Sequence, residues 1–225
     1  MIPVEIDTTN RDRYKPAWIE LFRNLNAVGN SAARYYDLKQ MYGQHGRRYH
    51  TWEHILFGLD EFEVFQQATG LARNPDAIIL AYCYHDSVYN LGPGIKDSDN
   101  VDQSAKHATT VLRQARLPET LIKTVANLIL VTKHTVPPNG IDEEIMADID
   151  LASLGKPADE FDKDGANIRA EYSWVTDEAY RAGRLGILEG FLKRRPIYHT
   201  AYFREKYEAQ ARENLERAID NFRSF

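Results

Sequence analysis

Apolar residues recur at helical spacing along most of the chain, and one segment is apolar on every side. Residues 77–84 read AIILAYCY, a run without a charged residue. A helix that is hydrophobic all round is normally buried in the interior of a protein. Asn74, Pro75 and Asp76 precede this run and are typical of a helix start, because proline at the first helical position needs no N–H donor. We therefore predict a buried helix that begins near Pro75.

Two further helices are predicted from the same pattern. Pro118 and Glu119 open an apolar-periodic segment that includes Val125, and Pro137 and Pro138 are expected to end it because proline does not fit inside a helix. A long amphipathic helix near the C-terminus has an apolar face made of Tyr207, Ala211, Leu215, Ala218 and Phe222. Alternating strand patterns are essentially absent from the sequence. The prediction is an all-α, single-domain helical bundle over residues 1–225.

Composition narrows the classes of function. The 225 residues include 28 Lys+Arg and 33 Asp+Glu, a formal net charge of −5, which argues against an extended nucleic-acid surface. No apolar run approaches the roughly 20 residues of a membrane span, and no basic stretch leads into an apolar one near the N-terminus. The single cysteine, Cys83, excludes an intrachain disulfide and fits a reducing compartment. We expect a cytoplasmic protein without a membrane segment.

The buried segment is followed directly by two titratable residues, His85 and Asp86. Burying such a pair costs several kcal/mol unless a partner satisfies both groups. A His–Asp hydrogen bond, or a helix-end pair that faces a loop, would satisfy them. A metal ion that binds both side chains would do so as well, and the position of the pair favours this second interpretation.

Two more histidines, His50 and His54, are four residues apart, a spacing that predicts one face of a helix. In the zinc protease motif a glutamate follows the first histidine directly. Thr51 occupies that position here and Glu53 precedes the second histidine, which argues against a protease of that type. Taken alone, the pair is more typical of two surface histidines on an amphipathic helix.

Two aspartates and another histidine complete the candidate set. Asp148 and Asp150 lie in an apolar context, although carboxylates at a helix end facing water would also explain them. His134 lies at the end of the predicted helix that begins near Pro118. A histidine in that position often only interacts with the helix dipole and the last carbonyl groups.

Taken in order, these motifs resemble the HD superfamily of metal-dependent phosphohydrolases, an all-α fold named for its adjacent His-Asp ligands. The similarity is to a branch of predicted phosphohydrolases whose substrates are not established, and it covers roughly residues 15 to 220. The similar segments are 49–55 (YHTWEHI), 84–89 (YHDSVY), 148–155 (DIDLASLG), 168–172 (IRAEY), 196–198 (PIY) and 211–215 (ARENL). One position departs from that branch: Val101 stands where a glutamate is usual, so the role of that glutamate is lost unless Asp102 replaces it.

The resemblance implies a ligand set of His54, His85, Asp86 and Asp150. The segment around His50 is also similar to the Tyr-His-Asn-x-x-His signature of cyclic nucleotide phosphodiesterases, in which the second histidine binds metal and the first is a general acid. By position this makes His54 the ligand and His50 the acid, and the Ala-Asp-Leu-Ser sequence of that branch favours Asp150 over Asp148 as the last ligand.

The implied activity is the hydrolysis of a phosphate ester in a small nucleotide or another phosphorylated metabolite, by metal-activated water with Asp86 in the catalytic set. Mixed imidazole and carboxylate ligands suit one, or two, ions of Mn, Fe, Co, Ni or Zn better than Mg. Candidates for a second metal or for binding phosphate are His134, Asp102, Lys133, Arg47 and Arg48. Two alternatives stay open, a di-iron oxygenase on the same scaffold and a non-catalytic module that binds metal or nucleotide. The sequence does not predict an oligomeric state.

Overall fold

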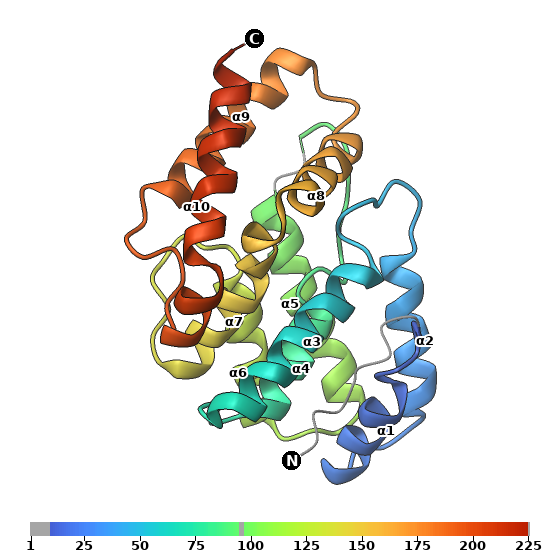
Figure 1. Cartoon of the computed structure of the whole chain (residues 1–225). Helices are drawn as coiled ribbons and strands as arrows, with labels where there is room; N and C mark the ends of the chain where they lie inside the picture. Colours follow the sequence, from blue (N-terminus) through green and yellow to red (C-terminus); the bar gives the residue numbers. More distant parts are fainter. Residues whose placement is uncertain (1–9, 95–96, 225) are drawn as a thin grey trace.

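The structure, a computed structural model, describes residues 10–94 and 97–224. Over these residues it is all-helical, with ten α-helices, one short 3₁₀ helix and no strand (Figure 1). This confirms the predicted all-α class. The elements in chain order are α1 (Lys15–Asn24), α2 (Ser31–Tyr42), α3 (Trp52–Thr69), α4 (Pro75–Tyr84), α5 (Asp97–Gln114), α6 (Glu119–Val131), α7 (Ile141–Leu151), η1 (Ala152–Gly155), α8 (Ala158–Glu171), α9 (Asp177–Leu192) and α10 (Ala201–Arg223).

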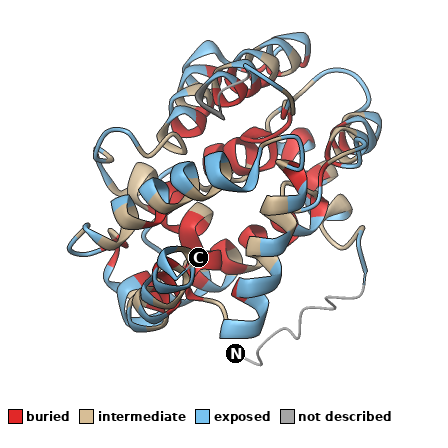
Figure 2. Ribbon diagram, turned by 90° about the horizontal axis from the view of Figure 1, so that it is seen from above, coloured by how far each residue is buried: buried red, intermediate tan, exposed pale blue. Residues whose placement is uncertain are grey.

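Helix α4 lies in the centre of the bundle, as its apolar sequence predicts. It begins at Pro75, and its side chains from Leu80 to Tyr84 are almost fully buried. In Figure 2 the buried positions cluster on the inner sides of the helices around this centre. Burial of this one helix therefore fixes the position of the His85-Asp86 pair, which follows it directly.

The Tyr82 ring of α4 packs directly against α3 at Gly58. A Cβ atom on Gly58 would lie 2.1 Å from the Tyr82 ring, so only glycine fits on α3 at this point. The Tyr82 hydroxyl in turn donates to the carbonyl oxygen of His54 at 3.3 Å. This close packing brings the beginning of α3, with His54, against the C-terminal end of α4, with His85.

The end of α6 differs from the prediction. The helix starts after Pro118 as expected, but it ends at Val131, six residues before the Pro137–Pro138 pair. Thr132 forms the C-terminal cap, and its side-chain hydroxyl donates to the carbonyl of Ile129 at 2.8 Å. His134 therefore lies in the loop beyond the helix, where it adopts a positive φ of 52°.

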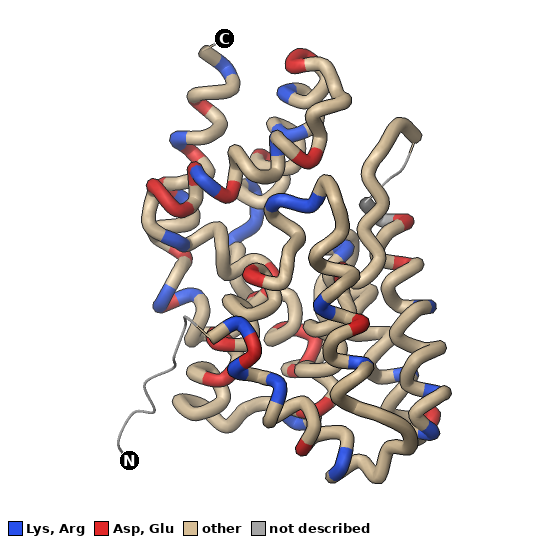
Figure 3. The backbone as a smooth tube through the Cα atoms, turned by 90° about the vertical axis from the view of Figure 1, so that its right-hand side faces the viewer, with Lys and Arg blue, Asp and Glu red and all other residues tan. Residues whose placement is uncertain are grey.

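The C-terminal helix α10 follows the prediction closely. Tyr207, Ala211 and Leu215 are buried on its inner face, and Ala218 and Phe222 are packed against the core. Acidic and basic residues alternate along the backbone without a large region of one sign in the view of Figure 3. None of the described helices is long and apolar enough to cross a membrane.

Candidate metal centre

Three segments that are far apart in the sequence bring His54, His85 and Asp150 together. His54 lies in the first turn of α3, His85 directly follows α4, and Asp150 lies in the last turn of α7. Each residue offers one ligand atom, and these atoms all lie within 4.8 Å of one another. His85 Nε2 is 3.3 Å from His54 Nε2 and 3.2 Å from Asp150 Oδ1. The three side chains are thus close enough to hold one metal ion.

Asp86 adds a second carboxylate to this group. Its Oδ2 lies 3.0 Å from His85 Nε2, and the residue is buried. Burial alone would raise the pKa of Asp86, but the adjacent His85 lowers it well below its usual range. Burial would likewise raise the pKa of Asp150, but hydrogen bonds from His134, His54 and His85 lower it. Both carboxyl groups are therefore ionised and can act as ligands.

The surroundings of the His85 imidazole suit either a metal ion or a proton. Its Nδ1–H donates to the carbonyl oxygen of Tyr82 at 2.7 Å, so Nε2 is the nitrogen directed at Asp86 and Asp150. A bare lone pair between two carboxylates would be repelled, and Nε2 must therefore share either a proton or a metal ion with them. Burial lowers the pKa of His85, but the two carboxylates raise it well above its ordinary value. Burial lowers the pKa of His54 and keeps that ring neutral, as a metal ligand must be.

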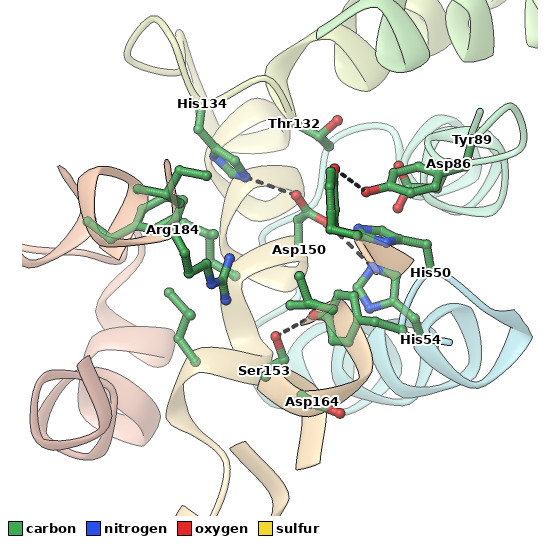
Figure 4. Close-up of a pocket in the computed structure, with 18 of the residues that line it drawn as sticks. His50, His54, Asp86, Tyr89, Thr132, His134, Asp150, Ser153, Asp164 and Arg184 are labelled. Carbon is green, nitrogen blue, oxygen red and sulfur yellow. Dashed lines mark hydrogen bonds and ion pairs between the residues drawn. The ribbon is translucent and has the colours of Figure 1, made fainter. Parts of the chain in front are cut away.

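His134 approaches the same carboxylate from the opposite side. Its Nε2 is 2.9 Å from Asp150 Oδ2, an interaction drawn in Figure 4. The loop that carries His134 is held by Arg194, whose guanidinium donates to the His134 carbonyl oxygen at 2.9 Å. His134 is therefore a fifth donor at the site, as the sequence suggested, and it is placed by the loop after α6 and not by the helix.

Asp148 and Asp150 point in different directions from α7. Asp148 accepts the backbone N–H groups of His199 and Thr200, both at 2.7 Å, at the start of α10. It is fully buried there and its hydrogen bonds join α7 to α10. The choice of Asp150 over Asp148 as the ligand thus agrees with the direction of the two side chains.

His50 does not lie on the same helix as His54, which corrects the expectation from their spacing. Helix α3 begins only at Trp52, and Thr51 before it has extended backbone angles. The buried carboxylate of Glu171 explains the difference, because its Oε1 accepts the N–H groups of Arg48, Tyr49 and His50 at 2.7 to 3.0 Å. A tight loop around one carboxylate therefore replaces the helical turn.

Glu171 also orients the His50 ring. Glu171 Oε2 lies 2.7 Å from His50 Nδ1, and the imidazole stacks on Tyr89 at a centroid distance of 3.9 Å. Burial would raise the pKa of Glu171, but its hydrogen bond with His50 lowers it. The carboxylate therefore holds an N–H on Nδ1, and a proton delivered from this ring to a substrate would come from Nε2. Sequence reasoning placed Glu171 in a similar segment but did not assign it a role.

Arg47 is not placed to bind phosphate, contrary to the expectation. The residue is only 4% exposed, and its guanidinium donates to the carbonyl oxygens of His50, Asp86 and Ser87 at 2.7 to 3.2 Å. Its hydrogen bonds join the His50 loop to the turn that carries Asp86. Arg47 is thus a positioning residue for both halves of the site.

Asp102 and Lys133 form an ion pair with each other. Lys133 Nζ lies 2.6 Å from Asp102 Oδ1, and neither residue lines the cavity at the site. Arg48 is exposed and contributes only its backbone N–H to the Glu171 loop. None of these three candidates for a second metal or for phosphate lines the cavity. Val101, the position that departs from the similar branch, is buried and lines the cavity with an apolar side chain.

The site opens into a cavity of about 370 Å³, within the range of small-molecule sites. Helices α8 and α9 line the side away from the ligands, and Figure 4 shows Arg184 extending from α9 into this space. Arg184 has no signal in the sequence, because no motif surrounds it and α9 contributes none of the candidate ligands. Comparisons of the chain with protein-family models, curated proteins and solved structures found no match.

Proposed function

We propose that this protein hydrolyses phosphate esters of small metabolites at a divalent metal site. The observation that carries the proposal is the convergence of His54, His85, Asp86 and Asp150 beside the His50–Glu171 pair in one cavity. The resemblance of the motifs to the HD phosphohydrolases supports the same reaction. The donor set of imidazoles and carboxylates suits Mn, Fe, Co, Ni or Zn.

The ligands and the acid have separate tasks. A divalent ion at such a site polarises phosphoryl oxygens and lowers the pKa of water. His54, His85, Asp86 and Asp150 would hold that ion. The imidazole of His50, oriented by Glu171, would donate a proton to the leaving alkoxide, which is otherwise a poor leaving group.

The shape of the cavity favours a small substrate. Its polar end is the metal centre, and its other walls include Ile168, Tyr180 and Phe191 from α8 and α9. A volume of about 370 Å³ accommodates a phosphate ester of nucleotide size but not a polymer. We therefore propose a small nucleotide or a similar phosphorylated metabolite as the substrate class.

A screen of phosphorylated metabolites tests the proposal. The protein is stripped of metal, reloaded with Mn, Fe, Co, Ni or Zn, and assayed for released phosphate. We expect at least one metal form to release phosphate, and Asp150→Asn to lose this activity. Asp220→Asn, which removes an exposed carboxylate from α10, serves as the matched control and should keep the activity.

The screen also separates the alternatives. A protein that binds metal but hydrolyses no phosphate ester in any metal form contradicts the proposal and favours a non-catalytic module. Iron-dependent oxygen consumption without phosphate release would favour the di-iron oxygenase. That chemistry needs six or more protein ligands for two irons, and the pairing of Asp102 with Lys133 removes one of the candidates.

A further inference from the structure

The charges in the cavity are strongly unbalanced. Asp86, Asp150 and Asp164 bring three carboxylates to its walls. Asp164 is already compensated, because Lys156 Nζ lies 2.8 Å from its Oδ2 in a largely buried ion pair. A phosphate dianion that enters this cavity needs positive charge besides that of a bound metal ion, since each desolvated negative group adds to the cost.

Arg184 is the only Lys or Arg among the described residues that line this cavity. Its guanidinium extends from α9 across the cavity from His50 and His54 (Figure 4). It makes no ion pair with any described residue, and Asp164 of the same cavity is paired with Lys156. The charge of Arg184 thus faces a space that the protein itself does not fill.

The position of Arg184 relates it to the metal centre. Tyr49, whose hydroxyl is 2.7 Å from the Ser153 hydroxyl, lines the same cavity as Asp150 and Arg184. A planar guanidinium with five donors binds phosphate oxygens in pairs, which a lysine ammonium does not do.

Two glycines of the adjacent helices are among the residues that line this cavity. Gly165 of α8 and Gly183 of α9 line the cavity, and a Cβ on either one would have no neighbour within 4 Å. Glycine inside a helix destabilises it relative to alanine. Neither glycine is required by close packing or by a positive φ, so the open volume they leave next to Arg184 is available to a ligand.

We propose that Arg184 binds the phosphoryl group of the substrate on the side of the cavity opposite His50. Arg184 takes the place that Arg47, Arg48 and Lys133 were predicted to fill. This inference rests on the proposed function, which supplies the phosphate ester. In this inference helix α9 binds the anion, whereas the loops and helix ends around α4 bind the metal.

The test is calorimetric titration of inorganic phosphate into the metal-loaded protein. Removing a charge-assisted, paired contact typically costs about 1.5–3 kcal/mol, so Arg184→Gln should weaken phosphate binding roughly 10- to 100-fold. Arg184→Lys should restore only part of the affinity. Lys163→Gln removes the same charge from an exposed position on α8 outside the cavity and should bind within about twofold of the parent. Metal content and circular dichroism are measured for each variant, to show that the ion and the fold are retained.

The outcomes distinguish this inference from the proposed function. Equal phosphate affinity of the parent and Arg184→Gln overturns it, as does a parent protein that binds no phosphate, even if phosphate esters are hydrolysed. Phosphate binding that is lost in Arg184→Gln supports it, even if the metabolite screen finds no substrate. In an active enzyme, Arg184→Gln should raise KM for the ester more than it lowers kcat.

Discussion

His50 and His54 line the same cavity but have different partners. His54 faces His85 and Asp150 at the ligand cluster, whereas His50 is bonded to Glu171 through Nδ1. The difference arises from the backbone, because the His50 loop wraps around the Glu171 carboxylate before α3 begins. This geometry separates a metal ligand from a proton donor.

The first prediction concerns His50. His50→Asn should keep its bound metal, because none of the cluster distances involves His50, but should lose about 10²–10⁴-fold in turnover of alkyl phosphate esters. A nitrophenyl ester, whose leaving group needs no proton, should be affected much less. Loss of metal from the variant would instead make His50 a ligand. Parent rates on both esters would make it a structural residue.

The second prediction separates the two aspartates of α7. Asp150→Asn should lose metal, because its carboxylate is shared by three histidines. Asp148→Asn should retain metal but lower the free energy of unfolding by about 1–3 kcal/mol, because the backbone N–H groups of His199 and Thr200, just before α10, lose a charged acceptor. Metal analysis and urea unfolding of both variants check this. Equal metal loss in the two would contradict the assignment.

The sequence indicates the proposed metal ligands but not the residues that position them or line the rest of the cavity. His85 and Asp86 were predictable, because titratable groups after an apolar helix need a partner. Glu171 and Arg184 lie more than a hundred residues from His50 and from the start of α3, and no periodicity links such distant positions. Arg47 was misassigned because a sequence does not show that three carbonyl oxygens surround its guanidinium.

At the scale of elements, buried helices were easier to predict than helix ends. The apolar run of α4 and the apolar face of α10 made both helices predictable, because the spacing of apolar residues shows which side of a helix is buried. The end of α6 was predicted too late. Thr132 and the positive φ of His134 end the helix before the prolines are reached. A positive φ is uncommon outside glycine, even at histidine, so the sequence indicates it only weakly.

The third prediction belongs to helix α9. Gly183→Ala should raise the free energy of unfolding by about 0.5–1 kcal/mol, a gain of roughly 1–4 °C in Tm, because the helix propensity improves and the added methyl meets no protein atom. Because Gly183 lines the cavity, the added methyl should also narrow it and raise KM for the phosphate ester. Thermal unfolding and steady-state kinetics check both parts. Gly190→Ala, on the same helix but outside the cavity lining, should stabilise without raising KM.

A Gly183→Ala protein that is more stable and has an unchanged KM would show that the substrate does not reach this part of the cavity. A less stable protein would show that Gly183 serves packing between helices. Either result would contradict a ligand-binding role for the part of the cavity that α8 and α9 line.

At the scale of the whole molecule, the proposed ligands come from α3, the end of α4 and α7, and His134 adds the loop after α6. These segments come together only when the chain folds. A metal ion at this site therefore binds the folded chain and not the unfolded one. Such an ion stabilises the fold by mass action, by about 4 kcal/mol at a thousandfold excess over Kd. Removing it also leaves Asp86 and Asp150 without a cation.

The most direct test of the central claim is elemental analysis of the protein purified without any chelator, together with its Tm before and after dialysis against EDTA. We predict a stoichiometric transition metal in the parent protein, its loss in Asp86→Ala and Asp150→Asn, and a lower Tm after EDTA that the same metal restores. A parent protein that contains no metal, takes up none of Mn, Fe, Co, Ni or Zn, and has a Tm that EDTA does not change would contradict the account.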